Sequence, residues 1–221
     1  MMLEELRKVV YKANMDLQKH GLVVGTSGNA SARDPETNLV VTKPSGMDFH
    51  QLTPENLVVV DLDGNVVEGD LKPSVDIPSI VYVLKRRDDV HGVVHTHSPY
   101  ATTFAIRGEE IPILTTTHSA LFGVPVPVSD YATIGEEEIG EQILNHVGDG
   151  TAVLVRSHGV FTIGKDVNRA LRSAMYVEES AEVAHLAMLR GPVAPLEDHV
   201  VAQMREWYLT GYGQKAVGSG S

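Results

Sequence analysis

The hydrophobic positions of this chain follow two patterns that alternate along it. Spacings of three and four residues predict helices, and short runs of β-branched residues bounded by Gly, Pro, Asn or Asp predict strands. The helical pattern covers residues 2–19, 76–87, 98–108, 135–147, 166–190 and 195–209. Strands are predicted at 38–42, on both sides of Asp63-Gly64, at 90–97, 111–117 and 124–129, and on both sides of His158-Gly159. This order predicts helices flanking a sheet in one α/β domain, and its hairpins mean that the sheet is not purely parallel.

Local signals sharpen some of these boundaries. The helix at 76–87 has Ser74 as its expected N-cap, with Pro78 in its first turn. Residues 21–33, GLVVGTSGNASAR, read as a glycine-rich polar segment. No repeat, linker or break in composition divides the chain, so we expect one domain over 1–215, followed by a flexible tail at 216–221.

Composition narrows the class of protein. The 221 residues are 43% hydrophobic and 21% charged, as in ordinary soluble globular proteins. No apolar run approaches the ~20 residues that span a bilayer, and the N-terminus shows no signal peptide. The chain has no cysteine, so a metal site would have to use histidine and carboxylate ligands. We expect a cytoplasmic protein with no membrane partner.

The formal net charge of −11 argues against a nucleic acid or an anionic membrane as partner, because both need a basic surface. It does not exclude a small anionic substrate. Backbone N–H groups, hydroxyls and one lysine can hold a phosphate locally within an acidic protein.

His95 and His97 lie two residues apart at the end of the strand predicted at 90–97. Residues i and i+2 of a strand point to the same face, so the two imidazoles should project side by side, as in half of a metal site. Two polar residues at a strand end are the alternative. For a third ligand His158, which ends an apolar strand and precedes a glycine, is favoured over His118.

Zinc is the leading metal for ligation by histidines, with manganese or cobalt as alternatives. Asp76, at the start of a predicted helix, is the candidate carboxylate. It is either a metal ligand or general base, or an acid that complements the helix dipole. The turns GTSGN (25–29), KPSG (43–46) and KPS (72–74) offer hydroxyls and N–H groups that could converge on an anion.

The ordered set GTSGNAS, KPSG, KPSVD, HTHS and SHG resembles the class II aldolase/adducin family over nearly the whole chain. That family contains zinc-dependent L-fuculose-phosphate aldolases and L-ribulose-5-phosphate 4-epimerases. The resemblance implies a three-layer α/β/α domain with a central, mostly antiparallel sheet. It also implies a homotetramer with active sites between subunits, acting on a sugar phosphate.

By this resemblance His95, His97 and His158 take the metal-ligand positions and Asp76 the acid/base position. Tyr212 matches a tyrosine that reaches the neighbouring subunit's site. The residues that match the phosphate-binding segments are Gly28, Asn29, Lys43, Ser45, Gly46 and Ser74. The implied chemistry is cleavage or formation of a C–C bond through a metal-stabilised enediolate.

Aldolase and epimerase share the retro-aldol step, but the epimerase also needs acid/base groups on a second face. The epimerase pattern has an aspartate where this chain has Ala120, and its C-terminal histidine aligns best with Trp207. We therefore favour an aldolase, with the epimerase as the alternative. A non-catalytic adducin-like domain and a zinc hydrolase are further alternatives.

Overall fold

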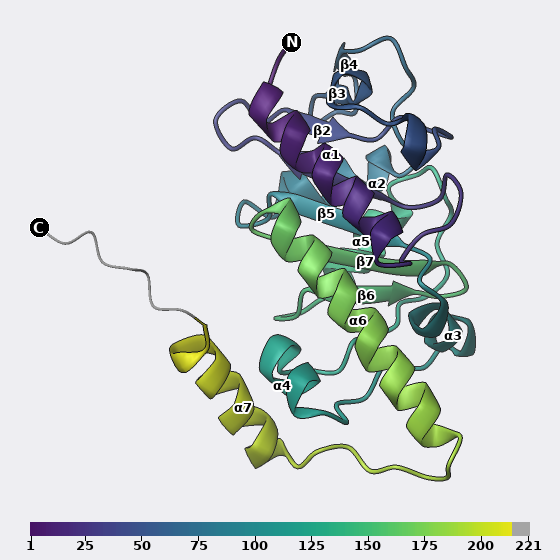
Figure 1. The fold of residues 1–221 in the computed structure, drawn as a ribbon, viewed down its shortest axis with the longest axis vertical. Helices are drawn as coiled ribbons and strands as arrows, with labels where there is room; N and C mark the ends of the chain where they lie inside the picture. Colours follow the sequence, from purple (N-terminus) through teal and green to yellow (C-terminus); the bar gives the residue numbers. More distant parts are fainter. Residues whose placement is uncertain (214–221) are drawn as a thin grey trace, which may run out of the picture.

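A computed structural model of the chain describes residues 1–213 (Figure 1). The tail predicted at 216–221 lies outside the described residues, so its flexibility and the boundary at 215 stay predictions.

One seven-stranded sheet forms the centre of the molecule, in the order β4-β3-β2-β1-β5-β7-β6, and every neighbouring pair is antiparallel. The sequence prediction of a central, mostly antiparallel sheet is therefore confirmed. The strands are β1 (Asn29–Arg33), β2 (Val40–Thr42), β3 (Val58–Val60), β4 (Val66–Glu68), β5 (Gly92–Thr96), β6 (Ala152–Val155) and β7 (Gly159–Gly164).

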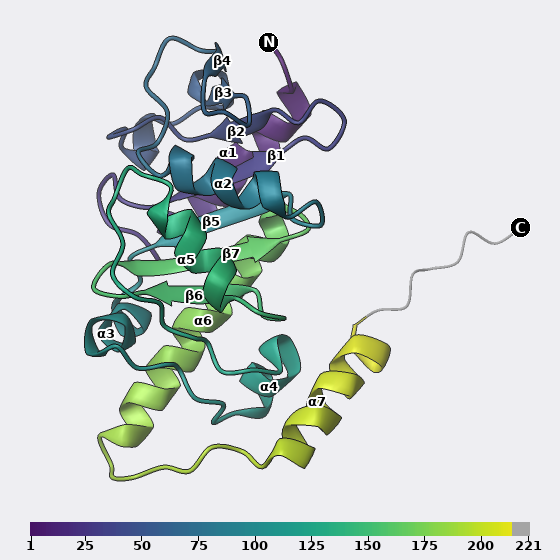
Figure 2. The ribbon, with the colours of Figure 1, turned by 180° about the vertical axis from the view of Figure 1, so that it is seen from behind.

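Helices cover both faces of this sheet, which confirms the three-layer arrangement. Figure 1 shows α1 and α6 crossing one face, and Figure 2 shows α2 and α5 on the other. The α-helices are α1 (Glu4–Lys19), α2 (Ile77–Arg86), α3 (Pro99–Arg107), α4 (Thr116–Phe122), α5 (Glu138–His146), α6 (Val167–Met188) and α7 (Asp198–Gly211). Two short 3₁₀ helices, Phe49–Gln51 and Pro54–Asn56, precede β3.

Alternation along the strands divides the core between the two faces. Val93 of β5 packs with Ile80 of α2 and Ile143 of α5 in one buried cluster. Its neighbour Val94 packs with Val10 of α1 in another. Successive side chains of a strand point to opposite faces, so a strand that helices cover on both sides is buried along its whole length. All five residues of β5 are buried.

Three predictions of secondary structure were wrong. Strand β1 lies in the segment that read as polar and glycine-rich, and its NASAR sequence is fully buried. Strands at 111–117 and 124–129 are absent from the described residues; only isolated bridges form there, and α4 occupies the end of the first. Ser74 is not the N-cap of α2: Asp76 is, and the Ser74 hydroxyl donates to the Asp76 carboxylate and accepts from the Asp76 backbone N–H, which precedes the helix.

Helix α7 stands apart from the sheet and packs mainly on α4 (Figures 1 and 2). It buries none of its residues within the chain, and Trp207, Leu209 and Tyr212 are all more than half exposed. Within residues 1–213, no helix has the length and apolar character that crossing a membrane requires.

Candidate metal centre and anion pocket

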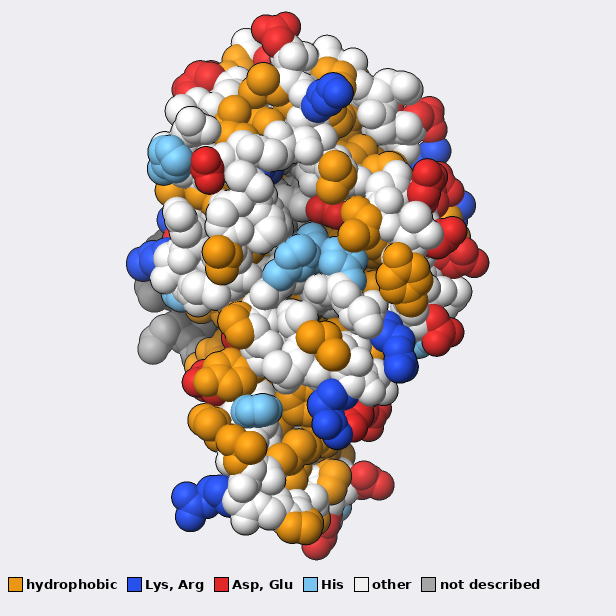
Figure 3. All heavy atoms as spheres, turned by 90° about the vertical axis from the view of Figure 1, so that its right-hand side faces the viewer, with side chains coloured by type: hydrophobic (Ala, Val, Ile, Leu, Met, Phe, Trp, Pro, Cys, Tyr) orange, Lys and Arg blue, Asp and Glu red, His pale blue; other side chains and the backbone are white. Residues whose placement is uncertain are grey.

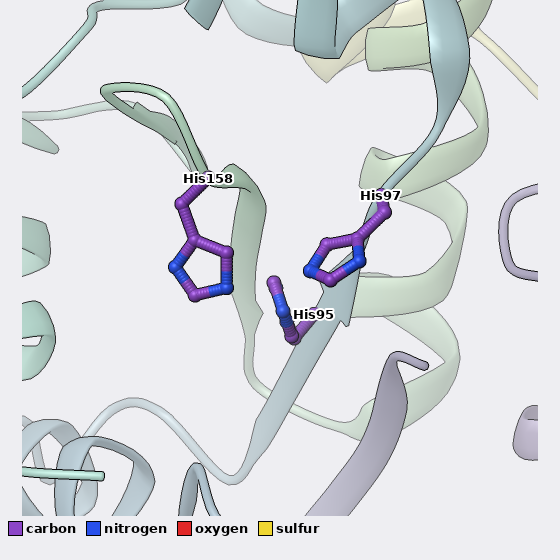
Figure 4. A group of neighbouring side chains, drawn as sticks. All are labelled: His95, His97 and His158. Atoms are coloured by element: carbon purple, nitrogen blue, oxygen red, sulfur yellow. The ribbon is translucent and has the colours of Figure 1, made fainter. Parts of the chain in front are cut away.

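Three imidazoles meet where two central strands end (Figure 4). His95 lies within β5, His97 follows that strand directly, and His158 lies in the turn between β6 and β7. Their ring centroids are 4.7 Å (His95–His97), 4.7 Å (His95–His158) and 5.2 Å (His97–His158) apart. One ring nitrogen from each lies within 4.8 Å of the others, so together they could hold a metal ion.

His95 is fixed on two sides. Its ring stacks on Phe161, its cross-strand partner in β7, with centroids 4.1 Å apart and planes at 11°. Its Nδ1 lies 3.0 Å from the backbone oxygen of Val160. Because a carbonyl oxygen only accepts hydrogen bonds, Nδ1 carries a proton, and in the neutral tautomer that this bond selects the lone pair for an ion lies on Nε2.

A tight turn holds His158 beside the other two rings. Ser157 adopts a left-handed conformation (φ 56°) immediately before it, which is costly for a residue other than glycine. Gly159 follows, and a Cβ there would lie 2.4 Å from the Thr96 carbonyl oxygen and 2.8 Å from Cδ2 of His97. Nδ1 of His158 is buried without a hydrogen-bond partner. The other ring nitrogen of His158 faces His95 and His97 (Figure 4), and one nitrogen from each of the three rings lies within 4.8 Å of the others, so these residues fit a metal.

The electrostatics favour neutral imidazoles. Burial lowers the pKa of His97 to about 4, with a further contribution from His95. Burial likewise lowers the pKa of His158 to about 4, and His95 and His97 add to the effect. At neutral pH both rings therefore present lone pairs, as metal ligation requires.

Asp76 lies beside the histidines, 6% exposed. Its Oδ2 accepts hydrogen bonds from Nδ2 of Asn29 (2.7 Å) and from the hydroxyl of Ser74 (3.2 Å). Asn29 is the cross-strand partner of His95, so the strand pair that carries the imidazole also fixes the carboxylate.

The ammonium group of Lys43 lies on another side of the same pocket. Lys43 is 2% exposed, and its ammonium donates to the Thr26 carbonyl oxygen at 2.9 Å. Burial lowers the pKa of this lysine, against the opposing charges of Asp48 and Asp76. Gly28 turns the chain with φ +76°, and a Cβ there would lie 2.4 Å from Cγ1 of Val23. This position accepts only glycine, since both its conformation and its surroundings exclude a side chain.

One pocket of about 340 Å³ brings together ten of the eleven predicted site residues. They are Gly28, Asn29, Lys43, Ser45, Gly46, Ser74, Asp76, His95, His97 and His158. Figure 3 shows the pale blue imidazoles lying in a hollow of this face. The eleventh, Tyr212, lies elsewhere, in a pocket between α4 and α7 that also contains Ala120 and Trp207.

The structure also adds residues that the sequence patterns did not single out. Val75 and Ile134 form an apolar edge of the pocket, opposite polar groups that include Thr26 and Ser27 of the predicted GTSGN turn. Val75 and Ile134 are 54% and 55% exposed. Their place in loops rather than in a periodic element leaves no pattern that could have predicted them.

His118 does not join the metal cluster. It is buried in α4, with Nε2 3.0 Å from the backbone oxygen of Val124. Of the two candidates for a third ligand, the structure therefore places only His158 beside His95 and His97.

Comparison with known proteins identifies relatives over almost the full length. The chain is 37% identical to the L-ribulose-5-phosphate 4-epimerase UlaF of Salmonella paratyphi C, over 97% of this chain and 98% of the relative. A solved L-fuculose 1-phosphate aldolase is 31% identical with a TM-score of 0.89, covering 95% of this chain and 98% of that one.

The L-fuculose-1-phosphate aldolase of Thermus thermophilus is 27% identical with a TM-score of 0.72, covering 87% of this chain and 98% of that one. Residues 8–185 match the sequence profile of the Class II Aldolase and Adducin N-terminal domain. The chain therefore belongs to the class II aldolase and adducin family.

Proposed function

We propose that this chain is a metal-dependent aldolase that cleaves or forms a C–C bond in a phosphorylated ketose. The observation that carries the proposal is the single pocket in which three imidazoles, a buried carboxylate and a buried lysine face one another. Neither a phosphate site nor a metal site alone would use all of these groups. A substrate with a phosphate at one end and vicinal oxygens at the other would use each of them.

The phosphate end is assigned to Lys43 and the three turns that hold Gly28, Asn29, Ser45, Gly46 and Ser74. Lys43 is held in the wall by the Thr26 carbonyl and by Phe49, whose ring centroid lies 4.9 Å from the ammonium. A phosphate would supply the counter-charge that this buried cation otherwise draws only from nearby carboxylates. Anchoring that end fixes the register of the reacting carbons.

His95, His97 and His158 would hold the metal, with zinc the leading candidate and manganese or cobalt as alternatives. A bound dication supplies Lewis-acid stabilisation of the negative charge that develops on two adjacent substrate oxygens. Neutral imidazole ligands bring no negative charge, so an ion held by them would keep its full positive charge.

Asp76 is assigned the proton transfer at the reacting carbon. Asn29 and Ser74 both donate to its Oδ2, so the direction of the carboxylate is set before substrate arrives. We assign the transfer of the substrate proton to Oδ1 of Asp76, the carboxylate oxygen that neither residue binds.

Aldolase is favoured over epimerase by the surface around Ala120. Among residues 1–213, those that line that pocket include Thr116, Arg172 and the three tyrosines Tyr176, Tyr208 and Tyr212, but no carboxylate and no imidazole. An epimerase needs proton transfer on two faces of the carbonyl that it re-adds, and among these residues only phenol groups could serve the second face. The relatives named as epimerases, 37% identical over nearly the whole chain, favour the epimerase as the second candidate.

We also propose that the protein is a homotetramer in which the surface formed by α4 and α7 covers a neighbouring subunit's pocket. The support is the exposed apolar side of α7, which the chain itself leaves uncovered. Tyr212 would then reach the neighbour's substrate as a proton donor.

The test is product analysis with metal-loaded protein on L-fuculose 1-phosphate and L-ribulose 5-phosphate. An aldolase releases dihydroxyacetone phosphate and a free aldehyde from the first. If the second is epimerised at C4 while no free aldehyde ever appears, the epimerase is correct. Protein that carries no stoichiometric metal would support the non-catalytic alternative instead.

A further inference from the structure

A second pocket, of about 230 Å³, lies where the first turns of α6 approach α7. Four basic side chains line it: Lys165, Arg169, Arg172 and Arg205. Its other polar groups include the hydroxyls of Thr151, Ser173, Tyr176 and Tyr208. None of its lining residues is an aspartate or a glutamate.

This pocket is distinct from the metal centre. Strand β7 begins at Gly159, beside His158, and ends at Gly164, beside Lys165. At a rise of about 3.3 Å per residue, the length of that strand separates the two sites by about 17 Å. No residue lines both this pocket and the pocket of the metal centre, whereas the Tyr212 pocket between α4 and α7 adjoins it and shares Leu121, Arg172, Tyr176 and Tyr208 with it.

This pocket is positively charged, whereas the chain as a whole is negatively charged. The chain has 29 acidic and 18 basic residues, yet four of the basic ones gather here. Across residues 1–213 none of the four forms an ion pair. Asp166 is the adjacent acid in sequence, and its carboxylate accepts the backbone N–H of Arg169 as the N-cap of α6. Like charges left together repel one another, and an anion would remove that cost.

Two of the guanidinium groups are held in place. The guanidinium of Arg172 faces the rings of Tyr176 and Tyr208, 5.8 and 5.7 Å from their centroids. Arg205 donates from Nη1 to the backbone oxygens of Ala120 (2.9 Å) and Leu121 (2.5 Å). A guanidinium held by its surroundings loses little freedom when it binds, and its planar fork matches a phosphate.

We propose that this pocket is a second anion site that takes a small molecule bearing a phosphate group. Its volume admits a phosphate with a few attached atoms, and the net charge of −11 opposes a polyanion as large as a nucleic acid. Arg172 and Arg169, three residues apart on one face of α6, are assigned the phosphate oxygens. The assignment does not depend on the aldolase function.

The test uses inorganic phosphate as the probe, titrated calorimetrically into the full chain at about pH 8, where the dianion predominates, and at low salt. The titration is made in Lys43→Gln protein, in which the proposed substrate-phosphate turns have lost their cation. We expect saturable binding of one phosphate per chain. Adding Arg169→Gln and Arg172→Gln should weaken that binding at least ~10²-fold, the scale of two charge-assisted contacts.

The matched control adds Arg86→Gln and Arg190→Gln, which remove the same charge from outside the pocket, and it should change the affinity less than about twofold. Absence of saturable phosphate binding in Lys43→Gln protein would overturn the second site while leaving the substrate-phosphate site intact. Equal weakening by the control pair would also overturn it, because the effect would then be one of net charge. If the Arg169/Arg172 variant no longer forms the oligomer but still binds phosphate as before, these two cations belong to a contact between subunits and the proposal is wrong.

Discussion

The side-chain amide of Asn29 donates to the carboxylate of Asp76 across 2.7 Å, although 47 residues separate the two in sequence. Asn29 also pairs with His95 across the strand ladder. One amide thus joins the carboxylate to the strand that carries the imidazoles, so any movement of β1 relative to β5 would disturb both parts of the site.

Asp76→Asn should keep its hydrogen bond to Asn29 and leave metal content unchanged, because an amide oxygen still accepts. Turnover should fall ~10²–10⁴-fold, the usual cost of losing a general acid or base. The measurements are single-turnover rates and metal content. Asp48→Asn, which removes another carboxylate near Lys43, is the control and should retain most activity. Full activity in the Asp76 variant would remove that residue from the chemistry.

His97→Ala should abolish metal binding and turnover while leaving a folded oligomer, because the side chain of His97 belongs to none of the hydrophobic core clusters. The melting temperature of wild-type protein should rise on adding zinc, and that of the variant should not. His199→Ala removes an exposed imidazole far along the chain and should behave like wild type. A His97 variant that stays fully active in a chelator would show that the histidine cluster is not the metal centre of the reaction.

Gly159→Ala tests how closely the β6–β7 turn packs against the imidazoles. A Cβ at that position would contact the Thr96 carbonyl and His97, so we expect a loss of about 1–3 kcal/mol in unfolding free energy. Zinc affinity should fall with it. Gly211→Ala, whose Cβ would meet nothing closer than 3.8 Å, is the matched control for urea unfolding and zinc titration. Equal behaviour of the two variants would contradict the close packing.

His118 should make stability depend on pH. Burial lowers its pKa below the ordinary value of 6.5. The unfolded chain therefore binds a proton that the folded chain does not, and the free energy of unfolding should decrease as the pH falls below about 6.5. His118→Gln should flatten this dependence in urea titrations of metal-free protein. His97 and His158 contribute equally to both proteins, so the difference between the two curves isolates His118, and parallel curves would disprove its contribution.

Mixing two inactive variants tests whether Tyr212 serves a neighbouring subunit. His97→Ala and Tyr212→Phe proteins, unfolded and refolded together in equal amounts, should recover about a quarter of wild-type activity, because that share of sites in a cyclic oligomer combines one intact half from each chain. Each variant refolded alone supplies the baseline. If mass analysis shows that the oligomers contain both variants and no activity is recovered, then each site is complete within one chain.

The parts of the fold that were predicted correctly are those where periodicity and burial agree. Helices α1 and α6 and strands β5 to β7 have long or strongly apolar patterns. Strand β1 was missed because its NASAR sequence has a low intrinsic preference for strands, and its small residues instead fit beneath α1. The strands predicted at 111–117 and 124–129 contain prolines that cannot donate to a ladder, and only isolated bridges form there.

The grouping of the three histidines could be predicted because His95 and His97 lie at the end of one predicted strand and His158 precedes a glycine. The contacts of Asn29 with Asp76 and of Lys43 with the Thr26 carbonyl could not, since each depends on how two turns meet in space. Tyr212 illustrates the limit: a motif match assigned it to a neighbouring subunit's site, and one chain shows only that it lines a pocket away from its own histidines. Its role, like the cytoplasmic location, stays a prediction.

The order of strands in the sheet has a consequence for how the protein matures. His95 and its hydrogen-bond partner Val160 are 65 residues apart in sequence, so the cluster forms only after the chain has closed that distance. Long-range pairing of this kind comes late in folding, because its loop entropy is lost before its contacts are gained. A nascent chain that has emerged only as far as β5 therefore lacks a complete set of ligands. We expect metal uptake to follow folding rather than to guide it, and the ion to slow unfolding once it is bound.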